Sequence, residues 1–141
     1  MILVSSCLLG INCKYNGKNN YNEKIEKILK TEEVLPLCAE QLGGLTTPRS
    51  PAEIKIINGE KRVFNKLGED VTENFLRGAN EILKMVKKFN IKKAILKEKS
   101  PSCGKGLIYS GNFDEKLVNG NGILVDLLIE NGVEVLTLEE I

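Results

Sequence analysis

The sequence predicts an α/β protein built on a parallel sheet, and two patterns support this prediction. Short apolar runs alternate along the 141-residue chain with charged segments whose apolar residues recur at helical spacing. Strands that alternate with helices form parallel sheets, because each helix carries the chain back across the sheet. The apolar runs are residues 2–6, 34–37, 94–96 and 133–138.

The first two runs each lead to a cysteine. Residues 2–6 end just before Cys7 and predict a buried strand that runs into a loop. A charged segment over residues 22–31 predicts a helix with one apolar face. Residues 34–37 predict a second strand, and Cys38 follows it directly.

The middle of the chain predicts an inserted β-hairpin. Residues 43–51 are rich in glycine, threonine and proline, which is typical of a long loop. The alternating segment 53–64 then surrounds Asn58-Gly59, a pair of residues that favours a two-residue hairpin turn.

The second half contains two further helices. Asp70 and Glu73 have the spacing of a capping box at a helix start. The apolar positions that follow at helical spacing are Phe75, Leu76, Ala79, Ile82, Leu83 and Val86. Residues 94–96 predict the third strand, residues 121–131 predict the last helix, and 133–138 the last strand. We therefore expect one domain over 1–141, a Rossmann-like parallel sheet flanked by helices, with an inserted β-hairpin.

Composition restricts the possible functions. Lys and Arg number 20 against 19 acidic residues, so no broad attraction to nucleic acid or membrane is expected. Lysines concentrate between residues 84 and 99, which we interpret as a solvated face, with an RNA contact as the alternative. No apolar run is long enough to cross a bilayer, and the first residues form a strand rather than a signal peptide. These features predict a cytoplasmic protein.

The chain has no histidine and no tryptophan. This excludes Ser-His-Asp and Cys-His catalysis, mixed Cys/His zinc sites and Rieske-type ligation. Acid–base chemistry at neutral pH must therefore use carboxylates, hydroxyls, lysines or thiols.

Three cysteines follow predicted strands. Cys7, Cys38 and Cys103 are expected to meet at the carboxyl edge of the sheet, where loops converge on one crevice. Thiolates bind zinc or iron–sulfur clusters, but the paired Cys-x-x-Cys spacing of structural zinc sites is absent. A cubane cluster with one iron free of protein ligands suits three thiolates, and a disulfide is the alternative that a reducing cytosol disfavours. Cys13 is either a packed thiol or a fourth ligand.

Four stretches, in the same order along the chain, resemble the thiouracil desulfidase family. They are Ser6-Cys7-Leu8-Leu9-Gly10, Cys38-Ala39-Glu40-Gln41-Leu42-Gly43-Gly44-Leu45, Thr47-Pro48-Arg49 and Ser100-Pro101-Ser102-Cys103-Gly104. The resemblance covers nearly the whole chain. It departs at Ala39, where the family often has Pro, and at Lys14-Tyr15-Asn16-Gly17, where the family has a basic-Tyr-Asp-Gly run.

The resemblance implies an oxygen-sensitive [4Fe-4S] cluster held by Cys7, Cys38 and Cys103, with the fourth iron free. It implies that this iron takes the sulfur of a thiolated uracil while water replaces sulfur at carbon, without net redox chemistry. The catalytic carboxylate then falls on Glu40 and the catalytic hydroxyl on Ser100.

Two neighbouring residues are candidates for substrate binding. Arg49 could bind a substrate oxygen, balance the charge of the cluster or pair with Glu53 in its own loop. Ser102 could donate a hydrogen bond to a cluster sulfur.

We therefore predict an enzyme that removes sulfur from a thiolated pyrimidine or a related thiolated compound. The alternatives are an iron–sulfur module for redox or sulfur trafficking, and a zinc-stabilised binding protein. The expected partners are a thiolated nucleobase or nucleoside and the iron–sulfur assembly machinery. No membrane partner is expected, and a modified tRNA is the one nucleic acid that we keep as a candidate partner.

Overall fold

The computed structural model describes residues 1–141, and a parallel sheet forms its centre. The strands lie in the order β2-β1-β5-β8, and all three pairings are parallel. Their bounds are Ile2–Ser5 (β1), Val34–Leu37 (β2), Lys93–Ile95 (β5) and Glu134–Leu136 (β8). The predicted α/β class and parallel sheet are confirmed, and all four strands end at the same edge.

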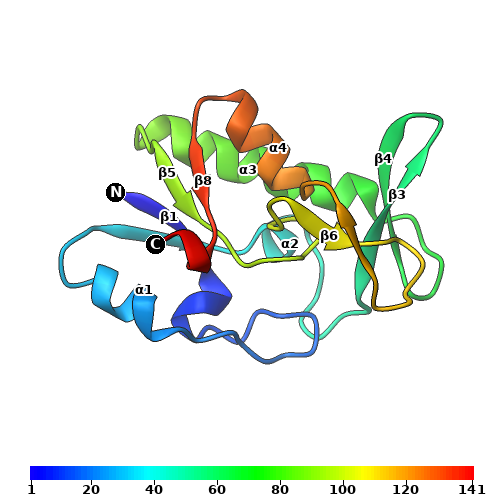
Figure 1. Ribbon diagram of the computed structural model, residues 1–141, viewed down its shortest axis with the longest axis horizontal. Coiled ribbons are helices and arrows are strands. Elements are labelled where there is room, and N and C mark those ends of the chain that lie inside the picture. The colour runs from blue at the N-terminus through cyan, green and yellow to red at the C-terminus, as the bar shows by residue number, and fades with distance from the viewer.

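Helices cover both faces of the sheet (Figure 1). α3 (Thr72–Lys88) and α4 (Ile123–Glu130) pack against each other on one face, and α1 (Glu23–Ile28) lies on the other. Successive side chains of a strand point to opposite faces, so Leu3 joins the core beneath α3 and α4 while Val4 joins the core beneath α1. None of these helices is both long and apolar enough to span a bilayer.

Two hairpins lie at the end of the molecule opposite the two termini (Figure 1). The predicted one is present as β3 (Ala52–Ile57) and β4 (Glu60–Asn65), with Asn58-Gly59 at its turn. The second pairs β6 (Leu107–Tyr109) with β7 (Leu117–Asn119) and was not predicted. Both strands have three residues and are mostly exposed, so no apolar run marks them as one marks the equally short β5 and β8.

Three local predictions were inaccurate. The helix expected over 22–31 is shorter, because it ends at Ile28. The capping box does not form: the carboxylate of Asp70 accepts the N–H of Thr72 over 2.9 Å, and Glu73 makes no return bond. Leu76 is 39% exposed, although its spacing predicted the apolar face of the helix.

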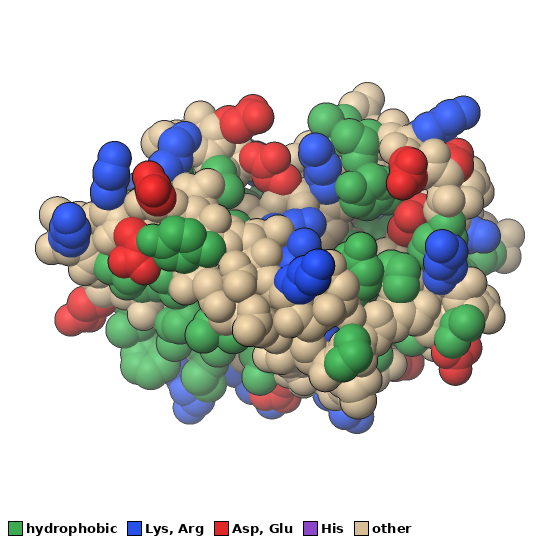
Figure 2. All heavy atoms as spheres, turned by 90° about the horizontal axis from the view of Figure 1, so that it is seen from below, with side chains coloured by type: hydrophobic (Ala, Val, Ile, Leu, Met, Phe, Trp, Pro, Cys, Tyr) green, Lys and Arg blue, Asp and Glu red, His purple; other side chains and the backbone are tan.

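The charges of the surface are mixed. On the face shown in Figure 2, basic and acidic side chains are interspersed and no broad basic patch is present. This distribution agrees with the balance of 20 basic and 19 acidic residues. The surface thus offers no strong electrostatic attraction for a nucleic acid on that face.

Candidate active site

Cys7 lies in a single 3-10 turn that follows β1. The turn ends at Gly10, whose φ of 91° lies in the left-handed region that glycine adopts without strain. The side-chain amide of Asn20 donates to Cys7 Sγ over 3.5 Å, and the backbone N–H of Asn20 donates to the Cys7 carbonyl over 2.9 Å. Both contacts fix the sulfur at the edge of the sheet.

Cys38 connects β2 to a one-turn helix, α2 (Ala39–Leu42), that was not predicted. This helix lies directly against α3, because a Cβ atom at Gly78 would overlap the carbonyl oxygen of Ala39. Glycine at this position therefore lets the two backbones touch. The contact holds α2 in place and, with it, the side chains of Cys38 and Glu40.

Cys103 lies further from its strand than the sequence suggested, because residues 96–102 separate it from the end of β5. The first turn of α4 holds this loop: the N–H of Ile123 donates to the carbonyl of Pro101 over 2.8 Å. The hydroxyl of Ser5, at the end of β1, donates to Cys103 Sγ over 3.5 Å. The third cysteine thus reaches the edge of the sheet by way of a fixed loop.

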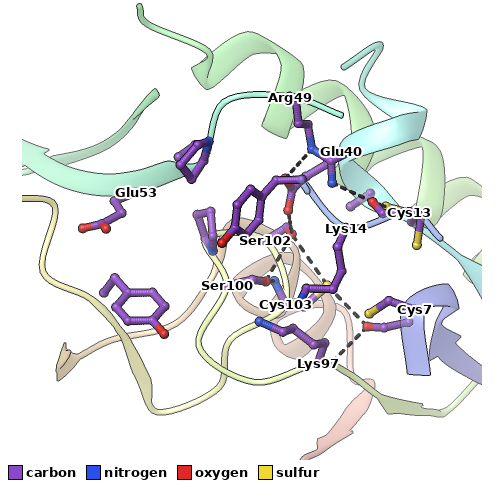
Figure 3. A pocket seen from close by; sticks show the side chains of 18 of the residues that line it. Cys7, Cys13, Lys14, Glu40, Arg49, Glu53, Lys97, Ser100, Ser102 and Cys103 are labelled. Atoms are coloured by element: carbon purple, nitrogen blue, oxygen red, sulfur yellow. Dashed lines mark hydrogen bonds and ion pairs between the residues drawn. The ribbon is translucent and has the colours of Figure 1, made fainter. Parts of the chain in front are cut away.

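All three cysteines line one cavity of about 540 Å³ (Figure 3). The other predicted site residues line it too: Glu40, Arg49, Ser100 and Ser102. Cys13, for which the sequence analysis left a ligand role open, also lines it. So do residues that the sequence analysis did not single out for the site, among them Lys14, Tyr15, Lys97, Tyr109 and Phe113. Side chains from distant segments of the chain therefore converge at one place.

The four thiols differ in how readily they lose a proton. A hydrogen bond with the thiol of Cys13 lowers the pKa of Cys7 to about 7 and that of Cys38 to about 6. The same two hydrogen bonds raise the pKa of Cys13, which is almost fully buried. Burial raises the pKa of Cys103 to about 11. Cys7 and Cys38 are thus prepared to act as thiolates, and Cys103 would lose its proton on binding a metal.

The donor set fits an iron–sulfur cluster. No three of the acidic and thiol side chains stand close enough together to hold one metal ion. A four-iron cluster binds each thiolate at a separate corner, and hydrogen bonds to its sulfurs tune it. Cys7 and Cys103 already accept such hydrogen bonds, from Asn20 and Ser5 respectively.

Glu40 is held at both carboxylate oxygens. Arg49 Nε donates to Oε1 over 3.0 Å, and the hydroxyl of Ser102 donates to Oε2 over 3.0 Å. The hydroxyl oxygens of Ser102 and Ser100 are 3.4 Å apart, and Ser100 Oγ accepts the N–H of Cys103 over 2.8 Å. Two hydroxyls and a carboxylate therefore form a continuous chain beside a cysteine, and a proton can pass along it.

Arg49 is engaged by the protein at all three guanidinium nitrogens. Besides Glu40, it donates to the carbonyl of Cys13 over 2.8 Å and to Thr46 and Thr47. The pairing with Glu53 that the sequence left open is absent, because Glu53 accepts backbone N–H groups of the 111–113 segment. With its side chain only 7% exposed, Arg49 is placed to hold Glu40.

Two residues of the cavity could have been found from the sequence. Lys97 follows the third predicted strand and so lies at the edge where Cys7 and Cys38 lie. Lys14 adjoins Cys13 in the segment that departs from the family pattern. The aromatic residue Phe113 gave no such signal, because it belongs to the turn of the unpredicted second hairpin.

Comparison with known proteins gives consistent matches over almost the whole chain. Residues 2–140 match the family model described as 2-thiouracil desulfurase. The uncharacterized protein YbbK of Bacillus subtilis (strain 168) is 44% identical over 147 residues, covering 100% of this chain and 97% of its own length. A solved structure described as the [4Fe-4S]-dependent thiouracil desulfidase TudS is similar with a TM-score of 0.90 and 38% identity, covering 99% of this chain and 91% of that one.

Proposed function

Because the chain belongs to the 2-thiouracil desulfurase family, we propose that it hydrolyses the C–S bond of a thiolated pyrimidine or a related compound. The observation that carries this proposal is the convergence of three cysteines with Glu40 and Ser100 on one cavity. In the reaction, the oxygen of water bonds to the ring carbon, the C–S bond breaks, and sulfur leaves as hydrogen sulfide. The ring keeps a carbonyl group, and no electrons are transferred.

The proposed cofactor is a [4Fe-4S] cluster, as in the similar solved structure. Cys7, Cys38 and Cys103 would hold three of its irons. When bound, the cluster would supply an iron without a protein ligand, which acts as a Lewis acid toward the sulfur of the substrate. The chain supplies the rest of the chemistry.

Glu40 is the proposed general base. Its two oxygens each accept one hydrogen bond, from Arg49 and Ser102, and each keeps a lone pair for a water molecule. Both contacts fix the direction of the carboxylate, so that a water between Glu40 and the substrate can be deprotonated as it attacks.

Ser100 is the proposed proton donor to the substrate ring. Its oxygen is held by the N–H of Cys103, which leaves its O–H free to turn toward the cavity or toward Ser102. Since Ser102 contacts Glu40, the proton taken from water can return through the two hydroxyls. We propose that Ser102 and Arg49 support the reaction by holding Glu40.

The direct test is anaerobic reconstitution of the full chain with iron and sulfide, followed by assay of sulfide release. We expect stoichiometric uracil and sulfide from 2-thiouracil, or uridine and sulfide from thiolated uridine. Glu40→Ala and Ser100→Ala should abolish most turnover while the visible absorption of the cluster is retained. A loaded protein that releases no sulfide from any thiolated pyrimidine would refute the proposed reaction.

One observation favours a second candidate, a module for redox or sulfur trafficking. Cys13 belongs to the same buried cluster as Cys7, and Cys38 packs against that cluster, so Cys13 could serve as a fourth ligand, and electron-transfer cubanes normally have four. This candidate predicts a reversible cluster potential and little effect of Glu40→Ala or Ser100→Ala. A zinc-stabilised binding protein would instead contain stoichiometric zinc and neither iron nor acid-labile sulfide.

The proposed partners follow from the chemistry. A small thiolated nucleobase or nucleoside fits a cavity of about 540 Å³, and the iron–sulfur assembly machinery would supply the cluster. Modified tRNA is the less favoured substrate because charges of both signs are mixed on the face of Figure 2.

A further inference from the structure

Lys97 is tied to the cysteine cluster through its own backbone. Its N–H donates to the hydroxyl of Ser5 over 3.0 Å, and that hydroxyl donates in turn to Cys103 Sγ over 3.5 Å. The side chain of Lys97 lines the cavity and points into it (Figure 3). The backbone of Lys97 is therefore held relative to Cys103 by two consecutive hydrogen bonds.

A second lysine, Lys14, lines the same cavity. Lys14 follows Cys13, and its side chain extends into the cavity toward Ser102 and Cys103 (Figure 3). The ammonium groups of Lys14 and Lys97 make no ion pair and no hydrogen bond within the chain. Burial lowers the pKa of Lys97, the negative charge of the nearby Cys7 opposes this effect, and the nearby Lys14 adds to it.

The acidic residues of the cavity do not neutralise these lysines. Glu40 is paired with Arg49. Glu53 and Asp114 accept hydrogen bonds from the second hairpin, within the 110–116 segment. The remaining carboxylate, Glu115, lies on the exposed rim. The two ammonium groups therefore face the cysteines without a carboxylate partner.

We propose that Lys97 and Lys14 form an anion-binding pair that holds an anionic sulfur atom beside the three cysteines. This inference rests on the proposed function, because that reaction involves two such anions. The released hydrogen sulfide is in part ionised to hydrosulfide at neutral pH, and a thiolated pyrimidine that loses its ring N–H proton carries negative charge on sulfur. Neutral uracil, the other product, has no such charge, so the pair distinguishes the sulfur species from the product that must leave.

The test is a binding titration of the anaerobically reconstituted holoprotein, followed by the visible absorption of its cluster. Sodium hydrosulfide, 2-thiouracil and uracil are the three probes. Lys97→Met removes the charge and keeps the length of the side chain, and Lys97→Arg restores the charge. Lys99→Met is the matched control, because Lys99 is exposed on the same loop and does not line the cavity. Iron and acid-labile sulfide are measured in every variant.

Lys97→Met should weaken binding of hydrosulfide, 2-thiouracil or both by about ten-fold or more, since one charge is lost from a partly buried pair. Lys97→Arg should recover most of the affinity, and Lys14→Met should show the same effect as Lys97→Met to a smaller degree. An effect on hydrosulfide alone assigns the pair to the leaving sulfide, and an effect on 2-thiouracil alone assigns it to the substrate. Either result supports the anion-binding pair.

Unchanged affinity for both sulfur probes would overturn the proposal. So would an equal loss for uracil, or the same loss in Lys99→Met, because each would mean that the charge acts without selecting an anion. If Lys97→Met fails to retain its cluster, Lys14→Met decides the matter by the same criteria. Absence of sulfide release from wild-type protein would refute the proposed function alone, since the titration with hydrosulfide still measures the lysine pair.

Discussion

The two faces of the sheet differ in what they bury. Beneath α3 and α4, 18 buried residues form one continuous apolar core. Beneath α1 the core has only seven buried residues, and two of them are Cys7 and Cys13. The larger core contributes most of the apolar burial, which is the main favourable term in folding. The smaller one gives up apolar packing for thiols, since Cys7 belongs to it and Cys38 packs against it, whereas Cys103 packs against the larger core. Most of the apolar burial thus lies on one face and two of the three proposed ligands on the other.

The sharpest test of this division is Cys38→Ser, on the thiol side. A serine hydroxyl is a poor iron ligand in place of thiolate, so we expect loss of the cluster and of all measurable sulfide release. Cys38 is partly exposed, so the free energy of unfolding of the cluster-free protein should change by less than about 1 kcal/mol. Iron analysis and urea unfolding measure the two effects. Cys13→Ser is the comparison variant, and it should retain the cluster.

Glu40→Gln should have the next largest effect. The amide keeps the shape of the side chain but cannot accept a proton, so turnover should fall by about 10²- to 10⁴-fold. The iron content should stay at the wild-type level, because Glu40 is not a proposed ligand. Steady-state assay of sulfide release checks the prediction, and turnover within a few-fold of wild type would remove Glu40 from the mechanism. Glu115→Gln, on the exposed rim, serves as the control.

On the other face, Ile82→Ala should affect stability and leave the chemistry intact. Ile82 is 1% exposed in the larger core, so its truncation should lower the free energy of unfolding by about 2–5 kcal/mol. Leu76→Ala, on the same helix but at a half-exposed position, should cost clearly less. Urea unfolding measures both. A change in turnover per bound cluster in Ile82→Ala would show that the two faces are coupled.

The smallest expected effect is a difference in alkylation rate between two thiols of the cluster-free protein, Cys38 and Cys103. A thiol reacts as its thiolate, which forms above its pKa. Because the pKa of Cys38 is lowered to about 6 and that of Cys103 is raised to about 11, Cys38 should be alkylated first at pH 7. We expect its rate with iodoacetamide to be at least about ten-fold higher, as determined by mass spectrometry. Raising the pH toward 11 should reduce the difference, and equal rates at pH 7 would contradict the assigned thiolates.

Much of the fold could be predicted from local patterns. The run 34–37 is β2 at the predicted residues, and Asn58-Gly59 forms the turn of the predicted hairpin. The family resemblance is confirmed by the match over residues 2–140. The second hairpin could not be predicted, because all three residues of β7 are exposed and no apolar periodicity marks it.

The sequence predicted which residues form the site more completely than it predicted the contacts between them. All seven predicted side chains line the cavity, because strands that run parallel must end at a common edge. Their individual roles remain predictions. The contact between Arg49 and Glu40 was not predicted, although the two residues lie only nine positions apart. The direction of loop 43–51 depends on the packing of α2 against α3, which no local pattern shows.

By itself, the sequence determined the order of strands and helices and the placement of Cys7 and Cys38 directly after strands, because side-chain periodicity and turn residues act over a few neighbouring positions. Only the tertiary structure decided that Cys13 joins one buried cluster with Cys7, that Ser102 contacts Glu40, and that two lysines share their cavity. These groupings bring together residues up to 83 positions apart, as for Lys14 and Lys97, which line the same cavity. Their geometry depends on how the sheet, its helices and the loops pack together, which no local pattern encodes.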